Sequence, residues 1–68
     1  MKIEDLKIGG IYRFKDSDDS FVRYLGIADN FIHMEFEYVK RNEDNEFVSR
    51  DCFIMFLDKL DILNLIEV

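Results

Sequence analysis

Carboxylates are the most numerous side chains in this sequence that could do chemistry, with fifteen Asp and Glu against nine Lys and Arg. Segment 16–20 reads Asp-Ser-Asp-Asp-Ser, and segment 42–46 reads Asn-Glu-Asp-Asn-Glu. Alternating aspartates can begin a calcium-binding loop, but such a loop also needs glycine at its sixth position and glutamate at its twelfth. Phe21 and Ile27 occupy those positions, so we expect segment 16–20 to be a solvated loop that holds no metal.

A second set of ligand-type side chains alternates along segment 31–38, where His33, Glu35 and Glu37 share one parity. Alternate side chains of a strand lie about 7 Å apart, which is too far for all three to hold one ion. We therefore interpret them as the polar face of a half-buried strand. The glutamates could instead form cross-strand ion pairs with one of three arginines, Arg13, Arg23 or Arg50.

Nucleophilic catalysis needs a nucleophile and a base held together, and the chain has one thiol, Cys52, and one imidazole, His33. Cys52 begins the apolar run 52–57, where a buried structural cysteine is the usual role, although a Cys52–His33 dyad stays open. One Cys and one His cannot supply the four ligands of a structural zinc site. We expect no catalytic residue, no metal and no cofactor, and predict that the chain is not an enzyme.

The length of 68 residues and the net charge of −6 limit the class of protein further. A chain this short forms one domain, residues 1–68, and its ten aromatic side chains can build a dense core. The absence of an apolar leader or of about 20 consecutive apolar residues predicts a cytoplasmic chain without a membrane segment. A negative charge opposes binding to nucleic acid and favours a basic protein surface as partner.

These side chains must be positioned by β-strands, because apolar and polar residues alternate along segment 31–38. Ile32, Met34, Phe36 and Tyr38 share one parity, which indicates a strand with one face in a core. Turn-forming residues separate this strand, 31–40, from others expected at 11–15, 21–28, 46–50 and 62–68. Strand 21–28 has apolar residues on both parities, which suggests a bulge near Gly26.

The segment 51–58 allows two interpretations. Phe53, Phe56, Leu57 and Leu60 match the spacing of a helical stripe, and Asp51 is a suitable N-cap. The alternative is a strand that continues through Leu57. We favour a short helical turn near 51–58, and therefore predict an all-β or mostly β fold: a five-stranded small barrel with one helical turn.

The same order of elements resembles SH3-like barrels. More narrowly, the chain is similar over roughly residues 8–60 to a family of short bacterial barrel proteins of unassigned activity. The corresponding segments are Gly10-x-Tyr12-Arg13-Phe14-Lys15, Tyr24-Leu25-Gly26-Ile27-Ala28 and Val48-Ser49-Arg50, followed by Phe53 and Phe56. Phe14 stands where that family has His, and the resemblance implies a fold but no site.

In an up-and-down sheet, loops 16–20 and 42–46 lie at the same end, which would gather their carboxylates into one acidic pole. The predicted partner-binding residues are Asp16, Asp18, Asp19, Glu43, Asp44 and Glu46. We predict a non-enzymatic protein-binding module whose pole docks on a basic surface, as a DNA mimic would. The partner would be a nuclease or polymerase, and the chain a phage or bacterial inhibitor or adaptor; charged loops that serve only solubility are the simpler alternative.

Two further functions stay open. The first is a nucleic-acid-binding barrel that uses a patch of Tyr12, Arg13, Tyr24 and Arg50. The second is a homodimer or larger homo-oligomer formed by the C-terminal apolar strand, through Ile62, Leu63, Leu65 and Ile66.

Overall fold

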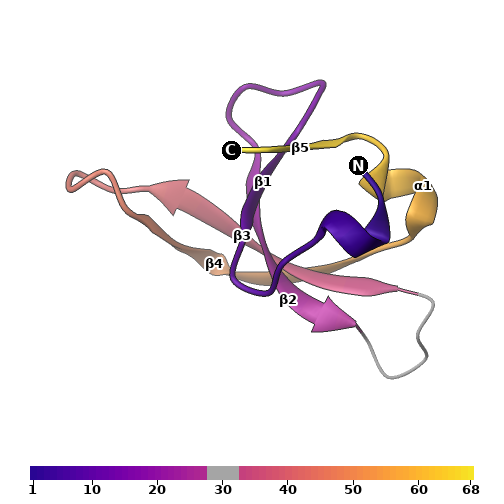
Figure 1. The fold of residues 1–68 in the computed structure, drawn as a ribbon. Coiled ribbons are helices and arrows are strands. Elements are labelled where there is room, and N and C mark those ends of the chain that lie inside the picture. Colours follow the sequence, from indigo (N-terminus) through magenta and orange to yellow (C-terminus); the bar gives the residue numbers. More distant parts are fainter. Residues whose placement is uncertain (28–32) are drawn as a thin grey trace.

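The computed structural model describes residues 1–27 and 33–68, without the side chains of residues 51 and 52. Five antiparallel strands form one sheet in the order β4-β3-β2-β1-β5, with a short helix and a 3₁₀ turn packed at one end (Figure 1). The elements are η1 (Ile3–Asp5), β1 (Ile11–Phe14), β2 (Phe21–Ile27), β3 (Met34–Arg41), β4 (Phe47–Leu57), α1 (Lys59–Ile62) and β5 (Leu65–Glu67). The turn predicted at Asp29 and Asn30 lies outside the described residues.

The mostly β fold with five strands and one short helix is confirmed, whereas the closed barrel is not. β4 and β5 are the two edges of the sheet, and within the described residues they do not pair with each other. β5 pairs with β1 on one side and has only three residues, so its other side offers a very short edge for closing the sheet.

The helical turn predicted near 51–58 is wrong, and the alternative of a strand through Leu57 is confirmed. β4 pairs with β3 from Phe47 to Leu57, and the helix begins only after Asp58. An Asp58 side-chain oxygen accepts a hydrogen bond from the backbone N–H of Asp61 at 2.9 Å, and an Asp61 side-chain oxygen accepts one from the Asp58 backbone N–H at 3.2 Å. This reciprocal capping makes Asp58 the N-cap of α1, seven residues after the predicted N-cap, Asp51.

Two irregularities shape the sheet. The bulge predicted near Gly26 is confirmed, because Tyr24 lies opposite Phe36 while Gly26 lies opposite the next residue, Glu35. β4 bulges more strongly. Ser49 pairs with Val39, and the next pair is Ile54 with Glu37, so five steps along β4 correspond to only two steps along β3. Such insertions bend a strand and increase its twist.

One face of the sheet carries the core. Phe36 is fully buried at its centre, with the ring of Tyr12 edge-on at 6.5 Å and the ring of Tyr24 tilted at 5.1 Å between centroids. Ile62 and Leu65 cover this face from α1 and β5 and are almost completely buried. Ile62 and Leu65 therefore complete the core, whereas Leu63 and Ile66, the other two residues suggested for a homodimer interface, are exposed and half-buried, respectively.

No helix in the described part of the chain is long and apolar enough to cross a membrane.

Candidate protein-binding site

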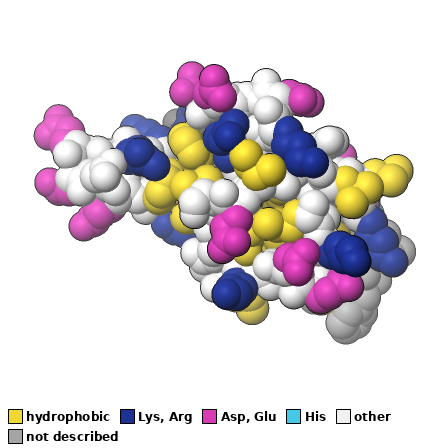
Figure 2. All heavy atoms as spheres, turned by 45° about the horizontal axis from the view of Figure 1, so that its top comes forward, with side chains coloured by type: hydrophobic (Ala, Val, Ile, Leu, Met, Phe, Trp, Pro, Cys, Tyr) yellow, Lys and Arg dark blue, Asp and Glu magenta, His cyan; other side chains and the backbone are white. Residues whose placement is uncertain are grey.

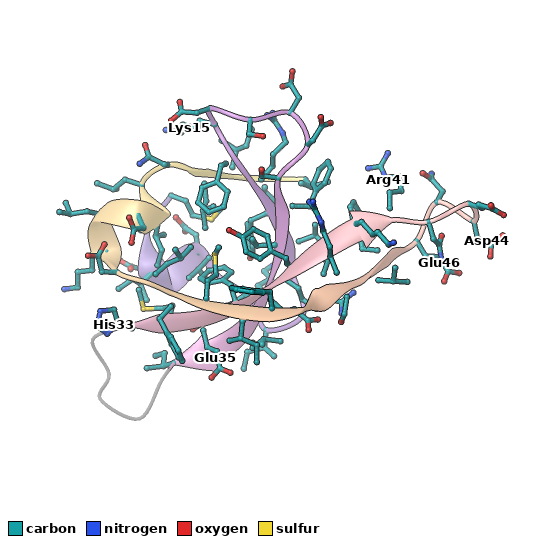
Figure 3. All side chains as sticks on the ribbon, turned by 180° about the vertical axis from the view of Figure 1, so that it is seen from behind. Lys15, His33, Glu35, Arg41, Asp44 and Glu46 are labelled. Atoms are coloured by element: carbon teal, nitrogen blue, oxygen red, sulfur yellow. The ribbon has the colours of Figure 1, made fainter. Side chains whose placement is uncertain are left out.

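The turn between β3 and β4 carries three of the predicted partner-binding residues, Glu43, Asp44 and Glu46, which we call the acidic tip. All three are exposed, and they lie at the far end of a hairpin that projects from the rest of the sheet (Figures 1 and 3). Figure 3 shows Asp44 and Glu46 at this end, with Arg41 closer to the body of the molecule.

Local hydrogen bonds hold the backbone of the acidic tip. The side-chain oxygen of Asn42 accepts hydrogen bonds from the backbone N–H groups of Asp44 and Glu46, both at 2.9 Å. The Asn42 backbone donates to the Glu46 carbonyl at 2.8 Å, and the Asn45 backbone donates to the Asn42 carbonyl at 3.0 Å. Asn45 adopts a left-handed conformation with φ of 66°, which asparagine tolerates better than most residues. The sequence therefore encodes a fixed turn that presents three carboxylates to solvent.

The stem of the hairpin is braced on the outer face of the sheet, opposite the core. The Arg41 guanidinium lies 4.9 Å from the Phe47 ring centroid and 5.8 Å from that of Phe21, and the two rings are 5.2 Å apart. Val39, the residue paired with Phe21, is almost completely buried. Cation–π contacts of this kind stabilise a structure modestly, and here they join β2 to both strands of the hairpin.

A polar network continues this brace. Arg23 donates a hydrogen bond to a Glu37 side-chain oxygen at 2.7 Å and another to the Phe47 backbone carbonyl at 2.8 Å. The Ser49 hydroxyl donates to the other carboxylate oxygen of Glu37 at 3.0 Å. Of the cross-strand pairs left open by the sequence, the structure therefore shows Arg23 with Glu37. The side chains of this pair are only 28% and 18% exposed, so the interaction is stronger than a fully solvated one.

The other acidic loop, between β1 and β2, holds Asp16, Asp18 and Asp19 in exposed positions. Arg13 bonds the Ser17 carbonyl at 3.0 Å and lies 3.3 Å from Asp18, which partly offsets the negative charge of this loop. The Asp18 side chain is fully exposed, so this ion pair is weak.

The structure gathers the carboxylates within each loop but does not unite the two loops into one acidic pole. Figure 2 shows the carboxylates in separate groups at the hairpin end and at the β1–β2 loop, with Lys and Arg side chains between them. Lys15, on the β1–β2 loop, lies far from the acidic tip in Figure 3. The twist of the sheet separates loops that a flat sheet would place side by side.

The patch predicted for nucleic acid does not exist as a surface. Tyr12 and Tyr24 are core residues, 2% and 5% exposed, whereas Arg13 and Arg50 lie on the solvated part of the molecule. The Tyr12 hydroxyl accepts a hydrogen bond from the Lys7 backbone N–H at 2.8 Å, and burial raises the pKa of Tyr24, with the neighbouring Tyr12 adding to the effect. Tyr12 and Tyr24 therefore belong to the core and not to a binding surface.

Sequence reasoning missed the aromatic–arginine brace formed by Phe21, Arg41 and Phe47. Its members come from three strands, and only the pairing register shows that they meet. In the described part of the chain, no three His, Cys, Asp or Glu side chains group as metal ligands would. The side chain of Cys52 lies outside the described residues, and so does the Cys52–His33 dyad that the sequence left open.

No family model, curated protein or solved structure matches this chain.

Proposed function

We propose that this chain is a non-enzymatic protein-binding module that docks on a basic surface of its partner through the acidic tip. The observation that carries the proposal is the turn itself: three exposed carboxylates on a backbone fixed by Asn42, at the end of a braced hairpin. A pre-ordered set of charges loses little conformational entropy on binding. Asp16, Asp18 and Asp19 form a second, separate acidic surface that assists through long-range attraction.

The partner we propose is an enzyme that acts on nucleic acid. Such enzymes hold phosphates with Lys and Arg, so their working surfaces are basic. A protruding set of carboxylates on a chain of net charge −6 offers the same kind of charge, and it would compete with or recruit the enzyme as a DNA mimic. In this proposal the chain is an inhibitor or adaptor of phage or bacterial type that works in the cytoplasm.

The test compares two variants that change the net charge by the same amount, because each replaces three carboxylates with lysine. The first carries Glu43→Lys, Asp44→Lys and Glu46→Lys in the acidic tip. The matched control carries Asp16→Lys, Asp18→Lys and Asp19→Lys in the β1–β2 loop. Both loops are exposed, so circular dichroism should show the wild-type fold for both.

Immobilised wild type and both variants are exposed to nuclease-treated bacterial lysate at low and high salt, and the retained proteins are identified by mass spectrometry. We expect proteins with basic surfaces that the wild type retains, that the loop variant retains less strongly, that the tip variant loses, and that high salt releases. Equal loss from both variants would show that net charge alone attracts the partner. Retention by the tip variant, or no salt-sensitive protein at all, would overturn the proposal.

A further inference from the structure

We propose that the edge of β4 over residues 53–57 binds the same segment of a second copy of this chain, so that two sheets join into one around a two-fold axis. This interface is separate from the acidic tip and does not depend on the proposed function. It also differs from the C-terminal interface that the sequence suggested.

Exposed apolar side chains are concentrated at this end of β4. Eight large hydrophobic side chains are exposed among the described residues, and five of them fall between Phe53 and Leu63. Three belong to β4 itself: Phe53, Ile54 and Phe56 are 64%, 48% and 57% exposed. Clusters of this kind on a small protein usually mark an interaction surface.

The two edges of the sheet differ in how well they are protected from pairing. β5 is three residues long and includes an exposed charge, Glu67. β4 has eleven residues, and the run from Cys52 to Leu57 contains no charged residue in a chain of which 35% is charged. Charges, proline, bulges and short length are the usual means of keeping an edge strand unpaired. The bulge of β4 ends before Ile54, and from Ile54 to Leu57 the strand pairs regularly with β3 and has neither a charge nor a proline, so its outer edge presents free strand hydrogen-bonding groups beside exposed apolar side chains.

A second copy suits this edge because the segment is complementary to itself. In an antiparallel pair centred on Met55, Ile54 of one copy lies opposite Phe56 of the other. Both side chains lie on the outer face of the sheet, because within each copy they pair with glutamates of β3. On the core face, Phe53 lies opposite Leu57. No like charges meet within the pair, and the two acidic tips point in opposite directions because the axis reverses one hairpin relative to the other.

The available area agrees with a reversible dimer. If a fully exposed large apolar side chain offers on the order of 200 Å², Phe53, Ile54 and Phe56 supply about 700 Å² for the pair of copies. Leu60 and Leu63, in α1 and just after it, are exposed but line a hollow together with Met1 and Ile3, so they are not counted in this interface. An area of this size is typical of weak, transient interfaces, so we expect a dimer that forms only toward the upper end of the concentration range tested below.

Sedimentation equilibrium of the full chain, from low micromolar to several hundred micromolar, tests the proposal. We expect a monomer–dimer equilibrium that high salt leaves unchanged or strengthens, since the interface is apolar and salt screens the repulsion between two acidic chains. Phe56→Lys or Ile54→Lys should weaken association tenfold or more, about 1.4 kcal/mol. Ile8→Lys is the matched control, because Ile8 is exposed but lies before β1, and it should leave the equilibrium unchanged.

Amide hydrogen exchange of the unmodified chain gives a second measurement that does not depend on how the variants fold. Amides within 53–57 should exchange more slowly as the concentration rises, while those of β5 should not change. A chain that stays monomeric throughout overturns the proposal and leaves the β4 edge to a different protein or to solvent. A dimer that is insensitive to Phe56→Lys and Ile54→Lys, or that protects β5 instead, overturns it as well. Replacing the three carboxylates of the acidic tip with lysine should leave the dimer intact, so failure of the dimer proposal and failure of the proposed function can be distinguished.

Discussion

Replacing Asn42 with alanine removes the one side-chain acceptor that two backbone donors of the acidic tip share. The N–H groups of Asp44 and Glu46 both point to this oxygen at 2.9 Å. A hydrogen bond of this kind contributes about 0.5–1.5 kcal/mol net, and water can replace part of it at an exposed turn. We therefore expect Asn42→Ala to lower the free energy of unfolding by about 1–2 kcal/mol.

This loss is measurable because the whole domain is only marginally stable. At about 0.05–0.15 kcal/mol per residue, a chain of this length unfolds with a free energy of about 3–10 kcal/mol. Urea unfolding followed by far-ultraviolet circular dichroism should show a lower midpoint with an unchanged slope. The backbone amides of Asp44 and Glu46 should exchange faster in Asn42→Ala, and the affinity for the partner should fall although no charge has changed.

Asn64→Ala is the matched control, since Asn64 is an exposed asparagine whose side chain takes part in no hydrogen bond among the described residues. It should shift the midpoint little. A loss below about 0.5 kcal/mol for Asn42→Ala, with unchanged exchange at the two amides, would refute the reasoning. The backbone bonds of the turn would then suffice to hold the acidic tip, and its order would not depend on Asn42.

Three further perturbations test the core, the chain before β1 and the helix cap. Phe36→Ala removes the fully buried centre of the core and should cost about 3–5 kcal/mol, enough to leave much of the protein unfolded in a calorimetric scan. Gly10→Ala would place a Cβ 2.8 Å from the Tyr12 hydroxyl and 2.9 Å from the Lys7 carbonyl, so thermal unfolding should show a loss of about 1–3 kcal/mol. The pKa of Asp58 is lowered, mainly by the backbone hydrogen bond it accepts at the start of α1. Because this pKa is lower in the folded state, the ionised cap stabilises the protein at pH values above the unfolded-state pKa. This stabilisation is lost as the pH falls through the folded-state pKa, so Asp58→Asn should flatten the acid limb of a stability–pH curve.

The sequence predicted strands where the signal is local. The alternation through Met34, Phe36 and Tyr38 indicates a strand with one buried face, and β3 occupies that place with Met34 and Phe36 buried. The bulge near Gly26 was predictable for the same reason, because apolar residues occur on both parities around this glycine. In the structure Gly26 has φ of +134°. The alternation of apolar residues and the residue types of a turn are properties of neighbouring residues, so they can be recognised without knowing which strand lies alongside.

The segment 51–58 could not be assigned in this way, because its apolar residues fit both periods. Ile54 and Phe56 are exposed at the edge while Leu57 is buried, and the bulge before Ile54 breaks the parity of β4. Pairing with β3, the preceding strand, decides between strand and helix, and this pairing is not visible in segment 51–58 itself. The separation of the two acidic loops has the same origin: strand order was predictable in principle, but the twist that turns the loops apart depends on packing of the whole sheet.

Together, the two proposals give a bivalent molecule. Met55 pairs with Phe36, and the path along β3 from Phe36 to Glu43 is about 23 Å at the usual rise per residue, so the two tips of a dimer would lie about 45 Å apart and face opposite directions. One compact partner could not engage both tips, whereas two partner molecules, or two sites on an extended assembly, could. Dimerisation would then raise the apparent affinity only for a partner that presents repeated basic surfaces. A partner with a single basic surface should bind the wild type and Phe56→Lys equally well, and a partner with repeated surfaces should bind Phe56→Lys more weakly, so titrating both proteins against it reports whether the dimer matters for docking.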